Sequence, residues 1–578
     1  MKANVDFEAH DNTIKDVLFS TYAFQVPRYQ RPYAWDNDQV SEFWDDIISS
    51  GRSPFIGSVI LNYETYEKSG HIDIIDGQQR LLTITIFIAV LRDIAKDIDI
   101  KTSELYQRHD IAIEDRSTGK MTYRIVAGDQ TREFFQKFIQ DSNYNILDAN
   151  PTTAEEIRIK KNYSFLYDKV KDELKKYSNK TDQLKYLNSL REKIANLTVI
   201  HIQIDNEEEA YEIFETTNAR GVDLSVADLL KNLIFKKLPP EEDKDFAREV
   251  WEEITKNIEE TNTEMKRFIR YYWISKYGSV RQKKLFREIK KETVDYKSLL
   301  EDMWESSELY NKIVEGGTDD WDNYKNGQKI FKSILAMRMM NVSQCYVLFM
   351  SILKNIDKLG TDPTRIFELI EKFTFQYSIV CKLPTNKLEK IYGKYANLIE
   401  TTIKKEDDKR IPSKIQSIFA ELEKELKKES PRSEHFISEF SNLSYRNSEQ
   451  YRRLIKYILS KIDSHYRETK EEMIDFDNVN IEHLLPQKPD KAWGLDKRDI
   501  KDYVNKLGNL TLIDKRINSR VGNKIIKEKI DTLSKSNLPI NKILIDELVS
   551  NKYIWNRDFI NRRQENYAKL AFEKIWNI

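Results

Sequence analysis

IDIIDGQQRLLTITIFIAVLRDI, residues 72–94, contains a predicted strand, turn and helix in succession. Ile72 to Ile75 form the β-branched strand, Asp76 to Arg80 form the turn around Gly77, and the residues from Leu81 onward continue as an apolar helix. This order suits phosphate binding, because N–H groups at a helix start point toward an anion and Gly77 lets the backbone bend toward it. Arg80 could hold a phosphate with two hydrogen bonds, and Asp76 could hold a metal or orient a water. An alternative fits the spacing equally well: Asp76 and Gly77 only turn the chain, and Arg80 pairs with a surface acid.

Two further polar segments accompany this unit. FQVPRYQRPYAW (24–35) contains two prolines and cannot form a regular helix, so we expect a rigid loop lined with polar groups. FETTNARG (214–221) separates two apolar helical stretches, and its Asn218 and Arg220 could complete a polar pocket. The sequence contains neither GxxxxGK[ST] nor GxGxxG, which disfavours P-loop ATPases and Rossmann dinucleotide enzymes.

Most of the remaining chain is predicted to be helical. Glycine and proline are scarce, at 16 and 13 residues, and the ranges 162–194 and 242–397 carry apolar residues at helical spacing. Two more stretches, FIGSVILN (55–62) and LTVIHIQI (197–204), predict strands that could pair with residues 72–75 in one small sheet. The predicted fold class is therefore α+β and predominantly helical.

The 578 residues are long enough for several domains. Charge-dense segments near residues 404–410 and 421–432 suggest a domain boundary. The residue pattern changes again after Asp475, from helical spacing to short strand-like segments. We expect three blocks: a mixed α/β part over residues 1–235, a helical middle over 236–440, and a small α/β part over 441–578.

Composition excludes several classes of protein. The chain has 94 Lys and Arg against 95 Asp and Glu, a net charge of −1, which argues against a uniformly basic nucleic-acid coat but leaves local basic grooves open. Two cysteines, Cys345 and Cys381, are too few for a disulfide framework or a four-thiolate zinc site, and we expect buried core thiols. The longest apolar run, Leu81 to Leu91, is too short to span a membrane, and the first residues do not resemble a secretory signal. We expect a cytoplasmic protein with no membrane partner.

The C-terminal block carries a second polar set. IEHLLPQ (481–487) is followed by LGNLTLI (507–513), Asn518 and Asn523, and His483 is the one histidine after Asp475, which excludes a multi-histidine zinc site. A histidine beside an acid, followed by spaced asparagines, suits phosphodiester hydrolysis: a neutral imidazole takes the proton of the attacking water, and a cation held by Glu and Asn oxygens stabilises the phosphorane. The alternative is that His483 ends a strand and the asparagines form turns.

Basic and aromatic residues surround this set. The basic ones are Lys515, Arg516, Arg520, Lys524, Lys527 and Lys529. They suit a phosphate backbone, although on a helix they could be only a solvated face. Aromatic residues in 555–560 and 570–576 have helical spacing, and we expect them to pack on the hairpin as core rather than to stack on bases.

The N-terminal half resembles the DUF262 domain, the GmrS-like half of GmrSD-type modification-dependent restriction enzymes. The resemblance is carried by VPRYQRPYAW (26–35), IIDGQQRLLT (74–83) and FETTNARGVDLSVADLLKN (214–232). It implies a fold similar to ParB and sulfiredoxin, in which the DGQQR turn binds and hydrolyses a nucleoside triphosphate, GTP or ATP. By position, the nucleotide pocket would be lined by Gln30, Arg31, Asp76, Gly77, Gln78, Gln79, Arg80, Asn218 and Arg220.

The C-terminal block resembles DUF1524, the GmrD-like partner, whose nuclease domain is a ββα-metal (HNH) finger. The resemblance implies that His483 is the general base, that Glu482 and Asn518 bind Mg²⁺ or Mn²⁺, and that Asn509 orients the histidine or its loop. Asn523 is an alternative ligand to Asn518, and the sequence does not choose between them.

Together the two resemblances imply an NTP-dependent restriction endonuclease of antiphage defence, which could form a homodimer. Its substrate would be modified double-stranded phage DNA, for example DNA with glucosylated hydroxymethylcytosine. Two alternatives are a nucleotide-gated sensor or clamp for modified DNA, such as phosphorothioate DNA, with weak or nicking activity, and an RNA-cleaving toxin.

Overall fold

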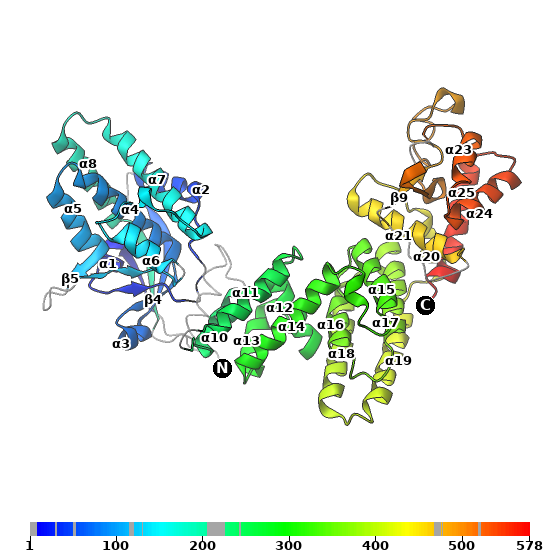
Figure 1. The fold of residues 1–578 in the computed structure, drawn as a ribbon, viewed down its shortest axis with the longest axis horizontal. Helices are drawn as coiled ribbons and strands as arrows, with labels where there is room; N and C mark the ends of the chain where they lie inside the picture. The colour runs from blue at the N-terminus through cyan, green and yellow to red at the C-terminus, as the bar shows by residue number, and fades with distance from the viewer. Residues whose placement is uncertain are drawn as a thin grey trace. The chain divides into compact units, whose positions relative to one another are not determined.

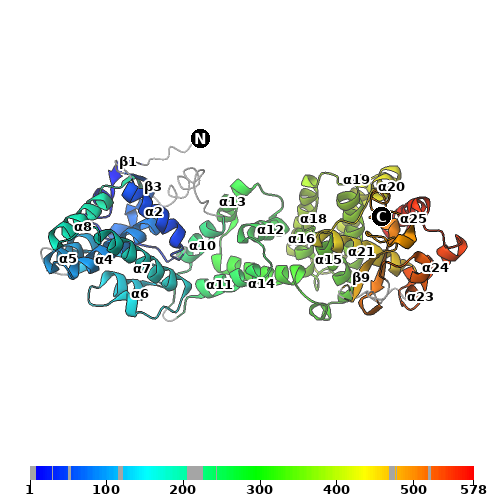
Figure 2. The ribbon, with the colours of Figure 1, turned by 90° about the horizontal axis from the view of Figure 1, so that it is seen from above.

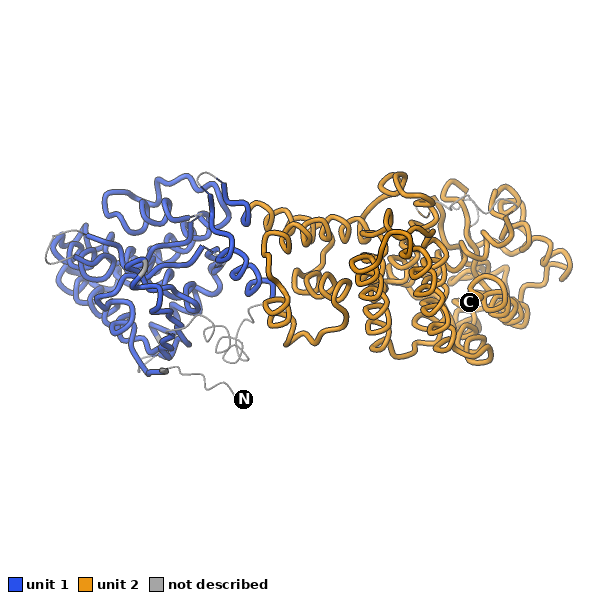
Figure 3. The backbone as a smooth tube through the Cα atoms, turned by 90° about the horizontal axis from the view of Figure 1, so that it is seen from below, with its two compact units in different colours: residues 1–248 blue, residues 249–578 orange. Residues whose placement is uncertain are grey.

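The computed structural model describes residues 8–28, 30, 32–49, 54–114, 121–129, 131–204, 226–241, 244–467, 476, 478–517 and 522–578. The chain divides into two compact units, residues 1–248 and residues 249–578 (Figure 3).

Unit 1 is built on a mixed six-stranded sheet with the order β1-β8-β3-β4-β2-β7. Its strands are β1 (Glu8–Thr13), β2 (Phe24–Gln25), β3 (Phe55–Asn62), β4 (Ile72–Asp76), β7 (Ile125–Val126) and β8 (Thr198–Ile204). The pairs β1–β8 and β3–β4 are antiparallel, and β3–β8, β2–β4 and β2–β7 are parallel. The three strands predicted from the sequence are confirmed, and they are neighbours in this sheet. A separate antiparallel pair joins β5 (Ala112–Glu114) and β6 (Met121–Tyr123).

One buried helix, α4 (Gln78–Lys96), organises the core of unit 1. Every residue from Leu81 to Leu91 is buried, which explains why this apolar run has no polar face. Helix α4 contacts α5, α7 and α8, and Figures 1 and 2 show these helices grouped around it. The other helices of the unit are α1 (Ile14–Val17), α2 (Asn37–Ser49), α3 (Tyr66–Ser69), α5 (Ile100–Tyr106), α6 (Arg132–Phe135), α7 (Ala154–Leu174), α8 (Lys180–Ala195) and α10 (Val226–Lys237).

Unit 2 begins with an all-helical part. Its helices are α11 (Phe246–Glu259), α12 (Met265–Tyr277), α13 (Leu285–Glu292), α14 (Tyr296–Val314), α15 (Gly327–Met340), α16 (Tyr346–Lys354), α17 (Thr364–Thr374), α18 (Asn386–Lys405), α19 (Ile411–Glu429), α20 (Ser433–Ser441) and α21 (Glu449–His465). Helices α16 to α19 lie side by side in Figure 1, with contacts between α16 and α18, α17 and α19, and α18 and α19. Cys345 and Cys381 are free and buried here, as expected. Across the described ranges, no helix is both long and apolar enough to cross a membrane.

The C-terminal part of unit 2 is a β-hairpin covered by helices. Strands β9 (Val479–His483) and β10 (Leu510–Asp514) are antiparallel, and α23 (Ile526–Leu533), α24 (Pro539–Ser550) and α25 (Arg557–Leu570) follow. Leu484 and Leu485 share a core with Trp555 and Phe559, so the prediction that the aromatic residues of 555–560 pack on the hairpin as core is confirmed.

The prediction that the aromatic residues of 570–576 also pack on the hairpin is wrong, because Phe572 packs against Phe436 and Trp576 against Phe375, both in the helical part. Trp576 stacks on Phe375 with ring centroids 3.9 Å apart, and its indole N–H donates to the Tyr457 hydroxyl over 2.9 Å. The structure thus confirms a mostly helical α+β fold, while the ParB-like and HNH assignments remain predictions.

Candidate functional site

The turn between β4 and α4 depends on a glycine. Gly77 has φ +91°, in the left-handed region, and a Cβ there would lie 3.1 Å from Val59 Cγ2 and 3.4 Å from the Ser58 carbonyl oxygen. Any side chain would therefore strain the backbone and crowd β3. Gly77 is also the N-cap of α4 and supplies no side-chain cap to the first N–H groups of the helix. The start of a helix suits an anion, because its first N–H groups point toward it.

Asp76 and Arg80 lie together on either side of this turn. Arg80 Nη2 is 3.6 Å from Asp76 Oδ2, and Arg80 Nη1 donates to the Ile56 carbonyl over 2.8 Å. Gly57 makes room for the guanidinium, because a Cβ at this position, with φ +102°, would lie within 2.3 Å of Arg80 Nη1. The sequence analysis did not predict a role for Gly57. The signal was that this glycine interrupts a predicted strand rich in β-branched residues. Both charged side chains are about a quarter exposed or less, so they remain reachable by a ligand.

Two of the predicted pocket residues tie the loop of residues 24–35 to the turn. Gln30 Nε2 donates to the Ile75 carbonyl over 3.0 Å. Gln79 accepts from Ala34 N–H over 2.7 Å and donates to the Pro32 carbonyl over 3.1 Å, and Gln78 beside it is buried. Gln30 and Gln79 therefore use these polar atoms to hold the fold, and their part in nucleotide binding stays a prediction.

The same loop is held from the other side by α7. Glu155 accepts the Tyr33 backbone N–H over 2.6 Å, and Asn162 donates to the Trp35 carbonyl over 2.8 Å. Burial raises the pKa of Glu155, although the hydrogen bond from Tyr33 opposes the shift. The Tyr33 hydroxyl is 2.7 Å from Thr83 Oγ1 on α4. No sequence signal marked Glu155 or Asn162, because both lie far along the chain in an ordinary amphipathic pattern.

Several predicted site residues lie outside the described residues. These are Arg31, Asn218, Arg220 and Asn518.

The hairpin in unit 2 places His483 at the end of β9, opposite Leu510 of β10. Its Nε2 lies 3.2 Å from Asn505 Oδ1, and the edge of the Tyr445 ring packs against the imidazole at 4.9 Å between ring centroids. Gln487 Nε2 donates to the same Asn505 oxygen over 2.8 Å. The amide nitrogen of Gln487 also lies 3.4 Å from His483 Nε2, so Asn505 and Gln487 both contact this ring nitrogen. Burial lowers the pKa of His483 to about 4, so the ring is neutral at pH 7.

Asn509 fixes the loop that follows His483. Its side chain is fully buried; Oδ1 accepts from Leu485 N–H over 2.8 Å and from the Trp555 indole N–H over 3.0 Å. Its Nδ2 donates to the carbonyls of Leu485 and Val504 over 2.9 and 2.7 Å. These hydrogen bonds hold Leu485 in place, and the role of Asn509 in catalysis stays a prediction.

Glu482 forms a buried ion pair. Lys529 Nζ lies 2.6 Å from Glu482 Oε1 and also donates to the His483 carbonyl over 2.9 Å, and the Lys529 side chain is fully buried. Burial raises the pKa of Glu482 and lowers that of Lys529, and each charge opposes the shift of the other. Lys529 is therefore part of the site and not of an exposed basic rim.

Among the residues that the structure describes, no group of three or more His, Cys, Asp or Glu side chains could hold a metal ion. The Glu482 carboxylate already faces an ammonium, so the described donors do not fit a divalent cation by themselves. Asn523, the alternative ligand, is exposed, and its carbonyl accepts from the Trp493 indole over 3.2 Å.

Comparison with models of protein families gives two matches. The model described as the N-terminal domain of GmrSD restriction endonuclease matches residues 14–235, and the C-terminal domain model of GmrSD restriction endonucleases matches residues 430–570. Together the two ranges cover more than half of the chain and include both polar sets. A search of curated proteins finds no match.

Proposed function

The chain belongs to the GmrSD restriction endonuclease family, and this membership supports a type IV restriction endonuclease. We propose that the protein cleaves modified double-stranded DNA and that His483 is the general base of the reaction. Glucosylated hydroxymethylcytosine DNA is the first substrate to test. The proposal extends the family assignment to a reacting residue and a substrate class.

The observation that carries this proposal is the state of the His483 ring. A general base must be unprotonated at working pH and must be held in one orientation. Burial keeps the imidazole neutral and the contact with Asn505 holds the ring in one orientation, so the unprotonated ring nitrogen would accept the proton of the attacking water. The hydroxide formed attacks phosphorus, the bond from phosphorus to the leaving oxygen breaks, and that oxygen takes up a proton from solvent. Asn509 acts indirectly, because it fixes the loop after His483 and does not contact the reacting atoms.

A divalent cation, Mg²⁺ or Mn²⁺, would supply charge neutralisation at the phosphate when bound. We assign it no step, because the described donors do not form a site for it. Removal of divalent cations with EDTA is therefore an arm of the test.

In unit 1 we propose that the turn between β4 and α4 binds and hydrolyses GTP or ATP. The support is the start of α4 at a glycine N-cap, next to the Arg80 guanidinium. Asp76 beside Arg80 would orient the attacking water.

One observation favours a second candidate, a nucleotide-gated sensor or clamp for modified DNA with weak or nicking activity. Glu482 is paired with Lys529, and weak cation binding at this carboxylate would let the hairpin bind DNA and cut it slowly. The two candidates differ in cleavage rate and not in binding.

The test compares wild type with His483→Ala on glucosylated phage DNA, phosphorothioate DNA, unmodified DNA and RNA. Each substrate is incubated with Mg²⁺ or EDTA, with and without GTP or ATP, and nucleotide hydrolysis is read in the same samples. We expect cleavage of one modified DNA by wild type alone, with hydrolysis retained in His483→Ala. Equal cleavage of modified and unmodified DNA would reject modification dependence, and nicking alone would favour the sensor. Cleavage of RNA alone would favour the toxin.

A further inference from the structure

A large open cavity lies within unit 2, between the helical part and the hairpin. Its volume is about 1560 Å³, and it is lined by parts of α12, α14, α15, α21 and β9. Pockets for small molecules usually measure about 300–1,000 Å³. The size of this cavity suits a segment of a polymer.

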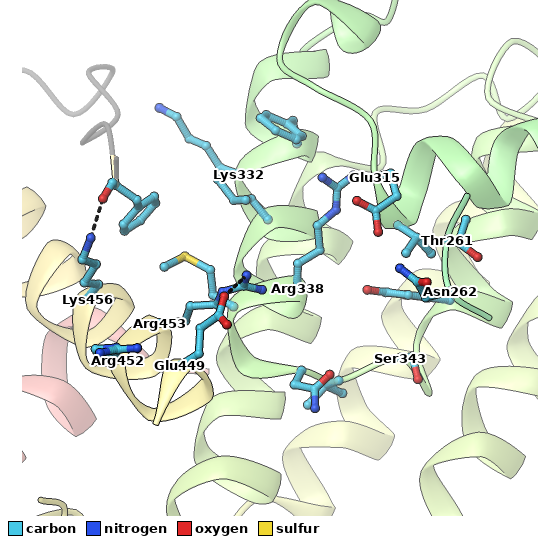
Figure 4. Close-up of a pocket in the computed structure, with 18 of the residues that line it drawn as sticks. Thr261, Asn262, Glu315, Lys332, Arg338, Ser343, Glu449, Arg452, Arg453 and Lys456 are labelled. Atoms are coloured by element: carbon cyan, nitrogen blue, oxygen red, sulfur yellow. Dashed lines mark hydrogen bonds and ion pairs between the residues drawn. The ribbon is translucent and has the colours of Figure 1, made fainter. Parts of the chain in front are cut away.

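The lining is strongly basic, although the whole chain has a net charge of −1. Among the described residues the cationic ones are Arg267, Lys332, Arg338, Arg452, Arg453, Lys456 and Lys515, and the acidic ones are Glu315 and Glu449. Figure 4 shows Lys332 and Arg338 on α15 and Arg452, Arg453 and Lys456 on α21. With Arg267 on α12 and Lys515 directly after β10, the cations come from several separate elements that border the same cavity.

Backbone carbonyls hold one of these cations in place without neutralising it. Arg338 donates to the carbonyls of Lys312, Ile313 and Gly316 over 2.8, 2.8 and 2.7 Å, at the C-terminal end of α14. Carbonyl partners fix the guanidinium but carry no formal charge. Arg267 is similar, since it donates to the hydroxyl groups of Tyr271 and Ser343. Both arginines thus keep a positive charge at the edge of the cavity.

The cavity is lined by neighbours of His483, although His483 itself is not among the lining residues. Asn480 and Ile481 of β9 line it, and so does Tyr445, whose ring packs edge-on against His483. A ligand in the cavity would therefore contact a residue, Tyr445, that packs on the imidazole.

We propose that this cavity is the cleft that binds the phosphodiester backbone of the DNA strand cut at His483; the proposal rests on the proposed nuclease function. Spread over three helices and the residue after β10, the cations match a chain of phosphates better than one compact anion. The helical middle then holds the substrate as well as joining the two ends of the chain.

The test replaces three cations at the cleft, Lys332→Gln, Arg452→Gln and Lys515→Gln, in a His483→Ala protein that binds without cutting. A matched control removes three exposed lysines on and beside α19: Lys409→Gln, Lys424→Gln and Lys428→Gln. Both proteins lose the same charge, so a general electrostatic effect would appear in both. Binding of a labelled duplex carrying the cleaved modification is measured by fluorescence anisotropy over a range of salt concentrations. The single charge reversal Arg452→Glu tests the same binding with one substitution. Circular dichroism of every variant shows whether it is folded, so that a binding defect is distinguished from misfolding.

We expect the cleft variant to bind at least about tenfold more weakly, and the slope of log K against log salt to fall by about 0.9 for each phosphate that the variant no longer neutralises. The control should stay within about twofold of the parent. Equal affinity and slope in the folded cleft variant and the control would overturn the cleft. Strong binding by the parent without any cleavage by wild type would instead reject the nuclease function and leave the cleft standing.

Discussion

Asn509→Ala tests whether the loop after His483 depends on one buried amide. The side chain has no exposed area, and its removal leaves the N–H groups of Leu485 and Trp555 without their acceptor. Each buried donor left unsatisfied costs about 1–3 kcal/mol, so the free energy of unfolding should fall by about 2–6 kcal/mol. The stranded carbonyls of Leu485 and Val504 add to this loss.

The assay is urea unfolding followed by tryptophan fluorescence, since Trp555 belongs to the network. Asn523→Ala is the matched control, because that asparagine is exposed in the same part of the fold and should change stability by about 0.5 kcal/mol or less. Cleavage by Asn509→Ala should also fall at temperatures where the protein remains folded. A loss of stability below about 1 kcal/mol would refute the reasoning.

Two further predictions concern the charged pairs next to each site. Arg80→Ala should weaken nucleotide binding roughly 10- to 100-fold, by removing a charge-assisted contact of about 1.5–3 kcal/mol, and Gly57→Ala should also weaken it by displacing the guanidinium. Unchanged affinity of both variants in calorimetric titration would place the nucleotide elsewhere. Lys529→Met should cost about 3–5 kcal/mol, because it leaves Glu482 charged and unpaired in a site where its side chain is 14% exposed. Glu482→Gln combined with Lys529→Met should recover most of that loss in urea unfolding, and simple additivity of the two single variants would show that the pair is not coupled.

The sequence predicted elements whose signal is local. Residues 72–94 form a strand, a glycine turn and a helix, because the isoleucines, Gly77 and the apolar run each favour one conformation. The sequence did not reveal β2 and β7, which are two residues long, or β1, which reads EAHDNT and has no apolar alternation. Neighbouring strands, and not their own residues, hold these segments in the sheet.

The site was predictable in part for the same reason. The position of His483 at a strand end follows from IEHLLPQ, and its burial beside Asn505 does not, because the two residues meet only when the hairpin and its loop fold. Lys529 looked like one of several surface lysines, yet it is fully buried against Glu482. The near-neutral total charge did not locate the cleft either, since its cations come from segments far apart in sequence.

The central claim is that His483 takes the proton of the attacking water, and the cleavage rate of His483→Ala under single-turnover conditions tests it most directly. His435→Ala is the control, because His435 is exposed on α20. General-base catalysis contributes about 10²- to 10⁴-fold, so the rate should fall by at least about 100-fold while DNA affinity is retained. A His483→Ala rate within about twofold of wild type would contradict the account.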